Sequence, residues 1–116
     1  MRIFIADSDK ELRLGLHMLF HQETGMHVIG MAVRTDGLAI QVAASQPDVL
    51  LVDSHLPGGS VEEELAKIRQ STRCPKIILM SVHAELEQDA LTAGADFFIA
   101  KDQAPGVLLE ALRGWK

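Results

Sequence analysis

The chain has 116 residues, 47% of them hydrophobic, and a net charge of −5 at pH 7. This length fits one domain with its own core, and the composition is unlike that of a disordered chain. The negative charge argues against direct binding of nucleic acid. A single cysteine, Cys74, excludes an internal disulfide and a cysteine metal site. Without a signal-peptide pattern or an apolar run near the roughly 18 residues of a membrane span, we expect a cytoplasmic protein with no membrane contact.

Short apolar runs alternate along the chain with stretches of helical spacing. Five runs predict strands, at Ile3–Ala6, His27–Ala32, Val49–Val52, Ile77–Met80 and Phe97–Ala100. Five stretches predict helices, at Asp9–Gln22, Asp36–Ser45, Ser60–Arg69, Ala84–Ala93 and Pro105–Arg113.

The helix ends carry recognisable signals. A capping box, in which a serine is followed three residues later by a glutamate, occurs at Ser8–Glu11 and again at Ser60–Glu63. Thr35 is the expected cap of the second helix, and Gly94 is the glycine expected to close the fourth. These signals predict where the connections between the elements lie.

The predicted strands are nearly all apolar, which is typical of strands covered by helices on both faces. Such strands form a parallel sheet, and right-handed crossovers connect them. We therefore expect an α/β fold of the flavodoxin-like, doubly wound kind. The expected strand order is 2-1-3-4-5, within a single domain spanning residues 1–116.

Four polar residues follow directly on, or end, four of the predicted strands: Asp7, Asp53, Ser81 and Lys101. The carboxyl ends of parallel strands meet at one edge of the sheet, where such folds bind their ligands. Two carboxylates placed together repel unless a cation lies near them, and Mg²⁺ prefers oxygen ligands of this kind. Lys101 can pair its positive charge with a phosphoryl oxygen, and Ser81 can donate a hydrogen bond to another. Asp53 could act as the nucleophile. The group is thus suited to phosphoryl transfer.

At this point the sequence resembles the receiver domains of response regulators, over essentially the whole chain. The resemblance is carried by four segments in the expected order, Ile3–Asp7, Asp48–Asp53 with Leu56–Gly58, Ile78–Ser81 and Gly94–Lys101. The last segment, followed by Asp102 and a helix that begins at Pro105, looks like the receivers of LuxR-type transcription regulators.

The resemblance implies a role for each residue of the group. Asp53 would be the phospho-acceptor, assisted by Ser81 and Lys101, and Ser81 would also act as a switch hydroxyl. Asp7, Asp53 and the backbone carbonyl of His55 would bind Mg²⁺.

The sequence departs from the family pattern in three places. Ser8 stands where the family has a second metal-binding acid, so we expect weaker magnesium binding, with Asp9 as a further candidate ligand. The small residue that usually follows the switch hydroxyl is Val82, which could crowd the switch aromatic. That aromatic is Phe98, which lacks a hydroxyl group and serves either as a switch or as packing.

Histidines could in principle add a metal site. His17 and His21 have the helical spacing of a ligand pair, but both are expected on the solvent side of the first helix. His55 and His83 are expected in loops at the mouth of the polar group, as surface residues.

Three functions remain open. The first is a receiver in a two-component phosphorelay: a histidine kinase partner phosphorylates Asp53, and the face formed by the fourth helix, fifth strand and fifth helix then changes. That face could form a homodimer and control an output domain or effector outside this chain, with transcription as the expected output. The second is a pseudo-receiver, a binding module with impaired phosphorylation because of Ser8. The third, a haloacid-dehalogenase-like phosphatase with Asp7 and Asp9 as catalytic pair, would be an enzyme, whereas the first two are not.

Overall fold

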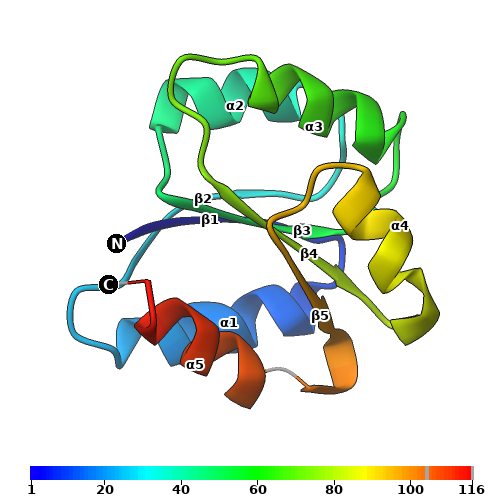
Figure 1. Cartoon of the computed structure of the whole chain (residues 1–116). Helices are drawn as coiled ribbons and strands as arrows, with labels where there is room; N and C mark the ends of the chain where they lie inside the picture. The colour runs from blue at the N-terminus through cyan, green and yellow to red at the C-terminus, as the bar shows by residue number, and fades with distance from the viewer. Residues whose placement is uncertain (104, 116) are drawn as a thin grey trace.

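A computed structural model describes residues 1–103 and 105–115. Its centre is a parallel five-stranded sheet in the order β2-β1-β3-β4-β5 (Figure 1), which confirms the predicted topology. The strands are β1 (Arg2–Ala6), β2 (His27–Ala32), β3 (Val49–Asp53), β4 (Lys76–Ser81) and β5 (Phe97–Ala100). The helices are α1 (Lys10–His21), α2 (Leu38–Ser45), α3 (Val61–Arg69), α4 (Glu87–Thr92) and α5 (Gly106–Arg113), with short 3₁₀ turns at Ala84–Leu86 and Lys101–Gln103.

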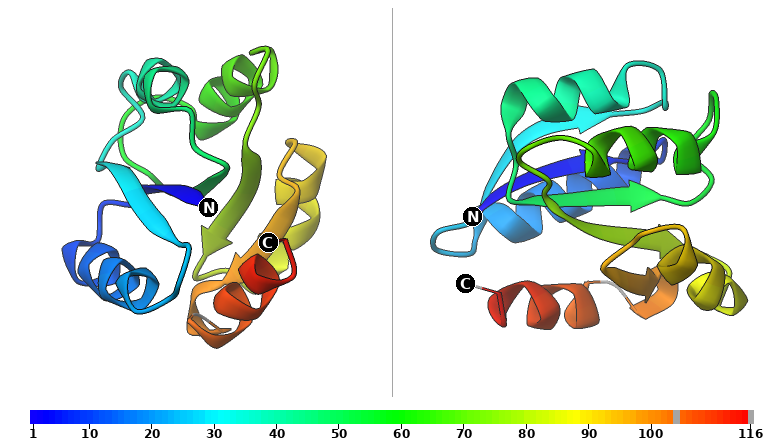
Figure 2. Two further views of the ribbon diagram at one scale, coloured as in Figure 1. Left: turned by 90° about the vertical axis from the view of Figure 1, so that its left-hand side faces the viewer. Right: turned by 45° about the horizontal axis from the view of Figure 1, so that its top comes forward.

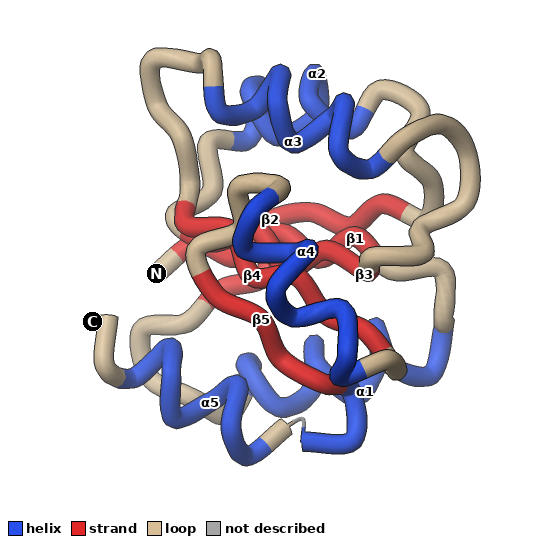
Figure 3. The backbone as a smooth tube through the Cα atoms, turned by 45° about the vertical axis from the view of Figure 1, so that its right-hand side comes forward, coloured by secondary structure: helices blue, strands red, loops and turns tan. Residues whose placement is uncertain are grey.

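The helices cover both faces of the sheet. Figures 1 and 2 show α1 and α5 on one face and α2 and α3 on the other, and Figure 3 shows α4 alongside β5. Alternate residues of β3 enter opposite cores: Leu50 packs on the α2–α3 side and Leu51 on the α1–α5 side. Both are fully buried, and such burial contributes about 1.5–3 kcal/mol for each side chain. This two-sided packing buries every residue of β3.

The start of α1 differs from the prediction. Asp9, and not Ser8, is the N-cap: its Oδ1 accepts hydrogen bonds from the backbone N–H groups of Glu11, at 3.0 Å, and Leu12, at 3.2 Å. Asp7 helps to select this register, because its Oδ1 accepts the backbone N–H of Asp9 at 2.8 Å. The chain therefore begins its helix one residue later than the Ser8 capping box implies, and Ser8 is exposed.

The start of α2 also differs from the prediction. Thr35 is buried and does not cap the helix, which instead begins after Gly37, a residue in the left-handed region with φ of 71°. The missing cap comes from α3, where Glu64 Oε1 accepts the backbone N–H of Ala39 at 3.1 Å. The hydrogen bond from Lys67, together with that from Ala39, holds the pKa of Glu64 below its usual value against the opposing effect of burial.

The later helices follow the predicted signals more closely. Ser60 caps α3 as expected, its Oγ accepting the backbone N–H of Glu63 at 3.2 Å. Gly94 has φ of 108° just beyond α4, in agreement with its expected role at the helix end. The predicted fourth helix is divided into a 3₁₀ turn and a short α4, and Pro105 is the N-cap of α5 and not part of its first turn.

The end of the described chain folds back on the sheet. The indole ring of Trp115, which is half-buried, packs edge-on against the ring of Phe97 in β5, with 6.1 Å between ring centroids. Within residues 1–103 and 105–115, the helices all fall short of the length and apolar character that crossing a bilayer requires.

Candidate functional site

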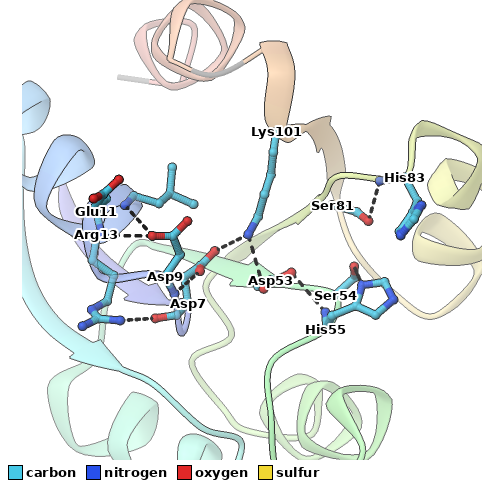
Figure 4. Close-up of polar contacts among 11 residues, drawn as sticks. Asp7, Asp9, Glu11, Arg13, Asp53, Ser54, His55, Ser81, His83 and Lys101 are labelled. Carbon is cyan, nitrogen blue, oxygen red and sulfur yellow. Dashed lines mark hydrogen bonds and ion pairs between the residues drawn. The ribbon is translucent and has the colours of Figure 1, made fainter.

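The carboxyl edge of the sheet carries a polar cluster made of Asp7, Asp53, Ser81 and Lys101 (Figure 4). Asp7 and Ser81 are fully buried and Asp53 is 8% exposed, unlike most polar side chains. They follow or end β1, β4 and β3, and Lys101 comes directly after β5. Parallel pairing of these neighbouring strands aligns their ends, which is why residues far apart in sequence converge here.

Lys101 is the centre of this cluster. Its Nζ lies 2.8 Å from Asp7 Oδ2 and 3.3 Å from Asp53 Oδ2. Burial works to lower the pKa of Lys101, but the hydrogen bond to Asp7 and the charge of Asp53 outweigh it and raise that pKa above its ordinary value. The lysine is therefore held as a cation between two carboxylates.

Two loops hold the remaining carboxylate oxygens. Asp7 Oδ1 accepts the backbone N–H of Asp9, and Asp53 Oδ1 accepts that of His55 at 3.1 Å. Arg13 also fixes the first loop, since its guanidinium donates to the backbone carbonyl of Asp7 at 2.8 Å. Sequence reasoning missed Arg13; its place one helical turn after Asp9 is the signal that could have indicated it.

Ser81 belongs to the same cluster, but within the described part of the chain its hydroxyl makes no hydrogen bond to Asp7 or Asp53. Its Oγ accepts the backbone N–H of His83 at 3.0 Å. Buried at the end of β4, next to β3, this hydroxyl lies on the same edge as Asp53.

Ser8, which stands in the place of the family's second acid, and Asp9, the further candidate ligand, both lie between β1 and α1. Ser8 is exposed, and the Oδ1 atom of Asp9 is engaged by the amides at the start of α1. The carboxylates of Asp7 and Asp53 therefore lie together at this edge, each close to Lys101. That these two carboxylates and the carbonyl of His55 bind magnesium remains a prediction.

This donor set suits a small hard cation. Asp7 Oδ2 is buried, and the ammonium of Lys101, 2.8 Å away, compensates its negative charge. Within the same residues, no three histidine, cysteine, aspartate or glutamate side chains form a ready metal cluster. Magnesium fits such a sparse set, because it takes one or two carboxylates and retains several water ligands.

Of the residues linked to switching, Ser81 belongs to the cluster, whereas Phe98 and Val82 lie outside it. Phe98 is half-buried and packs against the core on the α2–α3 side of the sheet. The side chain of Val82 is 70% exposed, which leaves it little opportunity to crowd that ring.

Comparison with known proteins gives a consistent result. Residues 3–113 match the family model described as Response regulator receiver domain. The chain is 34% identical over 113 residues to the nitrate/nitrite response regulator protein NarL of Escherichia coli, covering 95% of this chain and 52% of NarL. It is 35% identical to the transcriptional activator protein ExaE of Pseudomonas putida, covering 97% of this chain and 54% of ExaE. The chain thus spans about half the length of these curated relatives.

Solved structures agree in fold. A LuxR-family two-component response regulator from Aurantimonas sp. superposes with a TM-score of 0.87 and 25% identity, covering 98% of this chain and 83% of that one. The signal receiver domain of the putative response regulator NarL from Mycobacterium tuberculosis superposes with a TM-score of 0.87 and 24% identity, covering 98% and 94%.

Proposed function

The chain belongs to the response regulator receiver domain family, and we propose that residues 1–116 form one receiver domain in which Asp53 accepts a phosphoryl group. Receiver domains of response regulators are signalling domains and not classical enzymes. One observation carries the proposal: Lys101 Nζ lies within 3.3 Å of both Asp53 and Asp7 at the carboxyl edge of the sheet. A cation in this position can stabilise the negative charge of a transferring phosphoryl group.

The proposed reaction is a displacement at phosphorus. A carboxylate oxygen of Asp53 forms a bond to the phosphorus of a phosphohistidine in a kinase partner, and the P–N bond breaks as the histidine leaves. Lys101 and the Ser81 hydroxyl then bind phosphoryl oxygens. Receiver domains in general bind Mg²⁺ at this site, and here Asp7, Asp53 and the His55 carbonyl would hold it; when bound, it neutralises charge on the phosphoryl oxygens.

The proposed output surface is the face formed by α4, β5 and α5. Each of these elements exposes a large apolar side chain: Leu91 is 41%, Phe97 37% and Val107 38% exposed. Phosphorylation of Asp53 would draw in Ser81 and bias the rotamer of Phe98, which borders this face. A second copy of the chain or an output domain that controls transcription is the proposed partner of the surface.

The pseudo-receiver is the second candidate, and the β1–α1 turn favours it. With Ser8 exposed and Asp9 engaged in capping α1, the site has two carboxylates in place of three. The phosphatase alternative requires Asp9 as an acid–base group beside Asp7, and its engagement at the helix start argues against that role.

Beryllofluoride, a phosphoryl mimic, tests the proposal. Adding it with excess Mg²⁺ is expected to shift the backbone amide NMR signals of Ser81 and Lys101 and those of α4. Asp53→Asn should abolish the shifts, whereas Asp48→Asn, at the opposite edge of the sheet, should retain them. An unchanged wild-type spectrum would contradict phosphorylation and leave the pseudo-receiver.

Replacing Ser8 tests whether this residue limits the affinity for magnesium. Ser8→Asp is expected to increase the affinity for Mg²⁺ about tenfold, because it adds a charged oxygen ligand beside Asp7. Gln22→Asp, which adds the same charge just after α1, is the matched control. Equal affinities in the two variants would show that Ser8 does not limit binding.

A further inference from the structure

We propose that His55 and His83 form a separate binding site for a transition-metal ion such as Zn²⁺ at the mouth of the polar cluster. They come from the loops after β3 and β4, and their ring centroids lie 5.4 Å apart with the planes tilted by 59° (Figure 4). The inference rests on these two rings and is independent of whether Asp53 is phosphorylated.

The separation of the rings fits two ligands of one tetrahedral ion. A Zn–N bond of about 2.0–2.1 Å, with a further ~1.2 Å to the ring centre, places two such imidazoles roughly 5.2 Å apart between centres. The observed centroid separation of 5.4 Å is close to this value, so rotation of the two side chains is the movement that would turn both Nε2 atoms toward one ion. Both side chains are exposed, so small rotamer adjustments meet no packing barrier.

Each ring is already oriented through its other nitrogen. His55 Nδ1 lies 2.9 Å from Ser54 Oγ, and His83 Nδ1 lies 3.3 Å from Glu85 Oε1. Histidines that bind metals usually have an oxygen partner on the second nitrogen, which fixes the tautomer and leaves the other nitrogen as the ligand. Within the described residues both Nε2 atoms are without a polar partner, as this arrangement requires.

The chemistry of the ligands separates this site from the magnesium site. Imidazole nitrogen favours zinc, copper and nickel, whereas magnesium prefers the carboxylate and carbonyl oxygens of Asp7, Asp53 and His55. Two protein ligands leave positions for water, so the ion would exchange readily. It would also join the two loops that follow Asp53 and Ser81, and so restrict the mouth of the site.

Titration of the chain with ZnCl₂, followed by NMR of the histidine ring nitrogens, tests the proposal. The Nε2 signals of His55 and His83 are expected to shift together and saturate, while Mg²⁺ leaves them unchanged. His55→Gln and His83→Gln should each weaken zinc binding about tenfold or more, because each removes one ligand. Unchanged affinity in either variant would overturn the proposal.

Two controls locate the ion. The double variant His17→Gln/His21→Gln removes the helical pair on α1 and should leave zinc binding at His55 unaffected. Asp53→Asn should also leave it unaffected, and loss of binding in that variant would place the zinc on the carboxylates and contradict the proposal. Backbone amide spectra of all variants confirm that the fold is intact, since the replaced side chains are exposed or retain their shape.

Discussion

The two edges of the sheet each carry a pair of aspartates, and the pairs are built in opposite ways. At the amino edge, Asp48 and Asp96 are partly exposed, with 46% and 30% of their side chains accessible. At the carboxyl edge, Asp7 and Asp53 are almost fully buried and share the single ammonium of Lys101.

At the amino edge each carboxylate has its own hydrogen-bond donor and its own arginine. Asp48 accepts the backbone N–H of Arg2 at 2.7 Å and lies 3.8 Å from the guanidinium of Arg73. Asp96 accepts the backbone N–H of Ile77 at 2.8 Å and lies 3.3 Å from the guanidinium of Arg69. These aspartates tie strand starts together. The carboxyl edge instead concentrates negative charge on one cation, an arrangement typical of functional sites. The amino edge therefore has one arginine for each aspartate, whereas the carboxyl edge has one lysine for two buried aspartates.

The largest expected effect comes from Lys101→Met, which removes the cation between two buried carboxylates. Without divalent ions we expect a loss of about 3 kcal/mol in the free energy of unfolding, measured by urea denaturation at neutral pH. Lys76→Met, at the exposed start of β4, is the matched control and should cost little. An equal loss of unfolding free energy in both variants would show that the charge of Lys101 at the carboxyl edge does not stabilise the fold more than an exposed surface charge does.

The amino edge should show a smaller loss. Asp96→Ala leaves the backbone N–H of the buried residue Ile77 without its acceptor, so we expect a loss of about 1.5 kcal/mol in the same measurement. Asp102→Ala, an exposed position, provides the reference for removing one surface charge. If the two alanine variants unfold at the same urea concentration, Asp96 has no structural role of this kind.

Asp53→Ala should raise the free energy of unfolding, whereas the two preceding substitutions should lower it. It removes like-charge repulsion and leaves the Lys101–Asp7 pair intact, so we expect a gain of about 0.5 kcal/mol in metal-free buffer. A loss of unfolding free energy as large as that of Asp96→Ala would show that the aspartates at the two edges stabilise the fold in the same way, and would contradict the proposed difference between them.

The smallest effect concerns alkaline pH. Because the pKa of Lys101 is raised in the folded state, its stabilising contribution is complete below the ordinary pKa that it has in the unfolded chain, and is lost as the pH rises through the folded value. The stability difference between wild type and Lys101→Met should therefore narrow at strongly alkaline pH. A difference that stays constant would mean that Lys101 contributes packing and not charge.

Local sequence patterns predicted most of the fold and the members of the site. The apolar run at Val49–Val52 and the four other predicted strands indicate a parallel sheet. In such a sheet the strand ends bring Asp7, Asp53 and Lys101 to one edge, so the strand pattern alone is enough to predict that they meet. The magnesium ligands and switch residues remain predictions from family resemblance.

The helix starts show where local patterns are insufficient. Ser8 and Asp9 are both good capping residues, and a hydrogen bond to Asp7 helps to decide between them. Thr35 is engaged elsewhere, since its backbone N–H donates to the carbonyl of Pro57 in another loop. The first contact joins residues two positions apart and the second joins two loops, and the capping patterns contain neither of them.

The edge-on contact between Trp115 and Phe97 gives the molecule an intrinsic optical reporter. Trp115 is the chain's single tryptophan, and it rests against the strand that also carries Phe98. Its fluorescence therefore originates from one place, the junction of β5 with the residues after α5. A change in emission on adding a phosphoryl mimic would report movement of that junction without any attached dye.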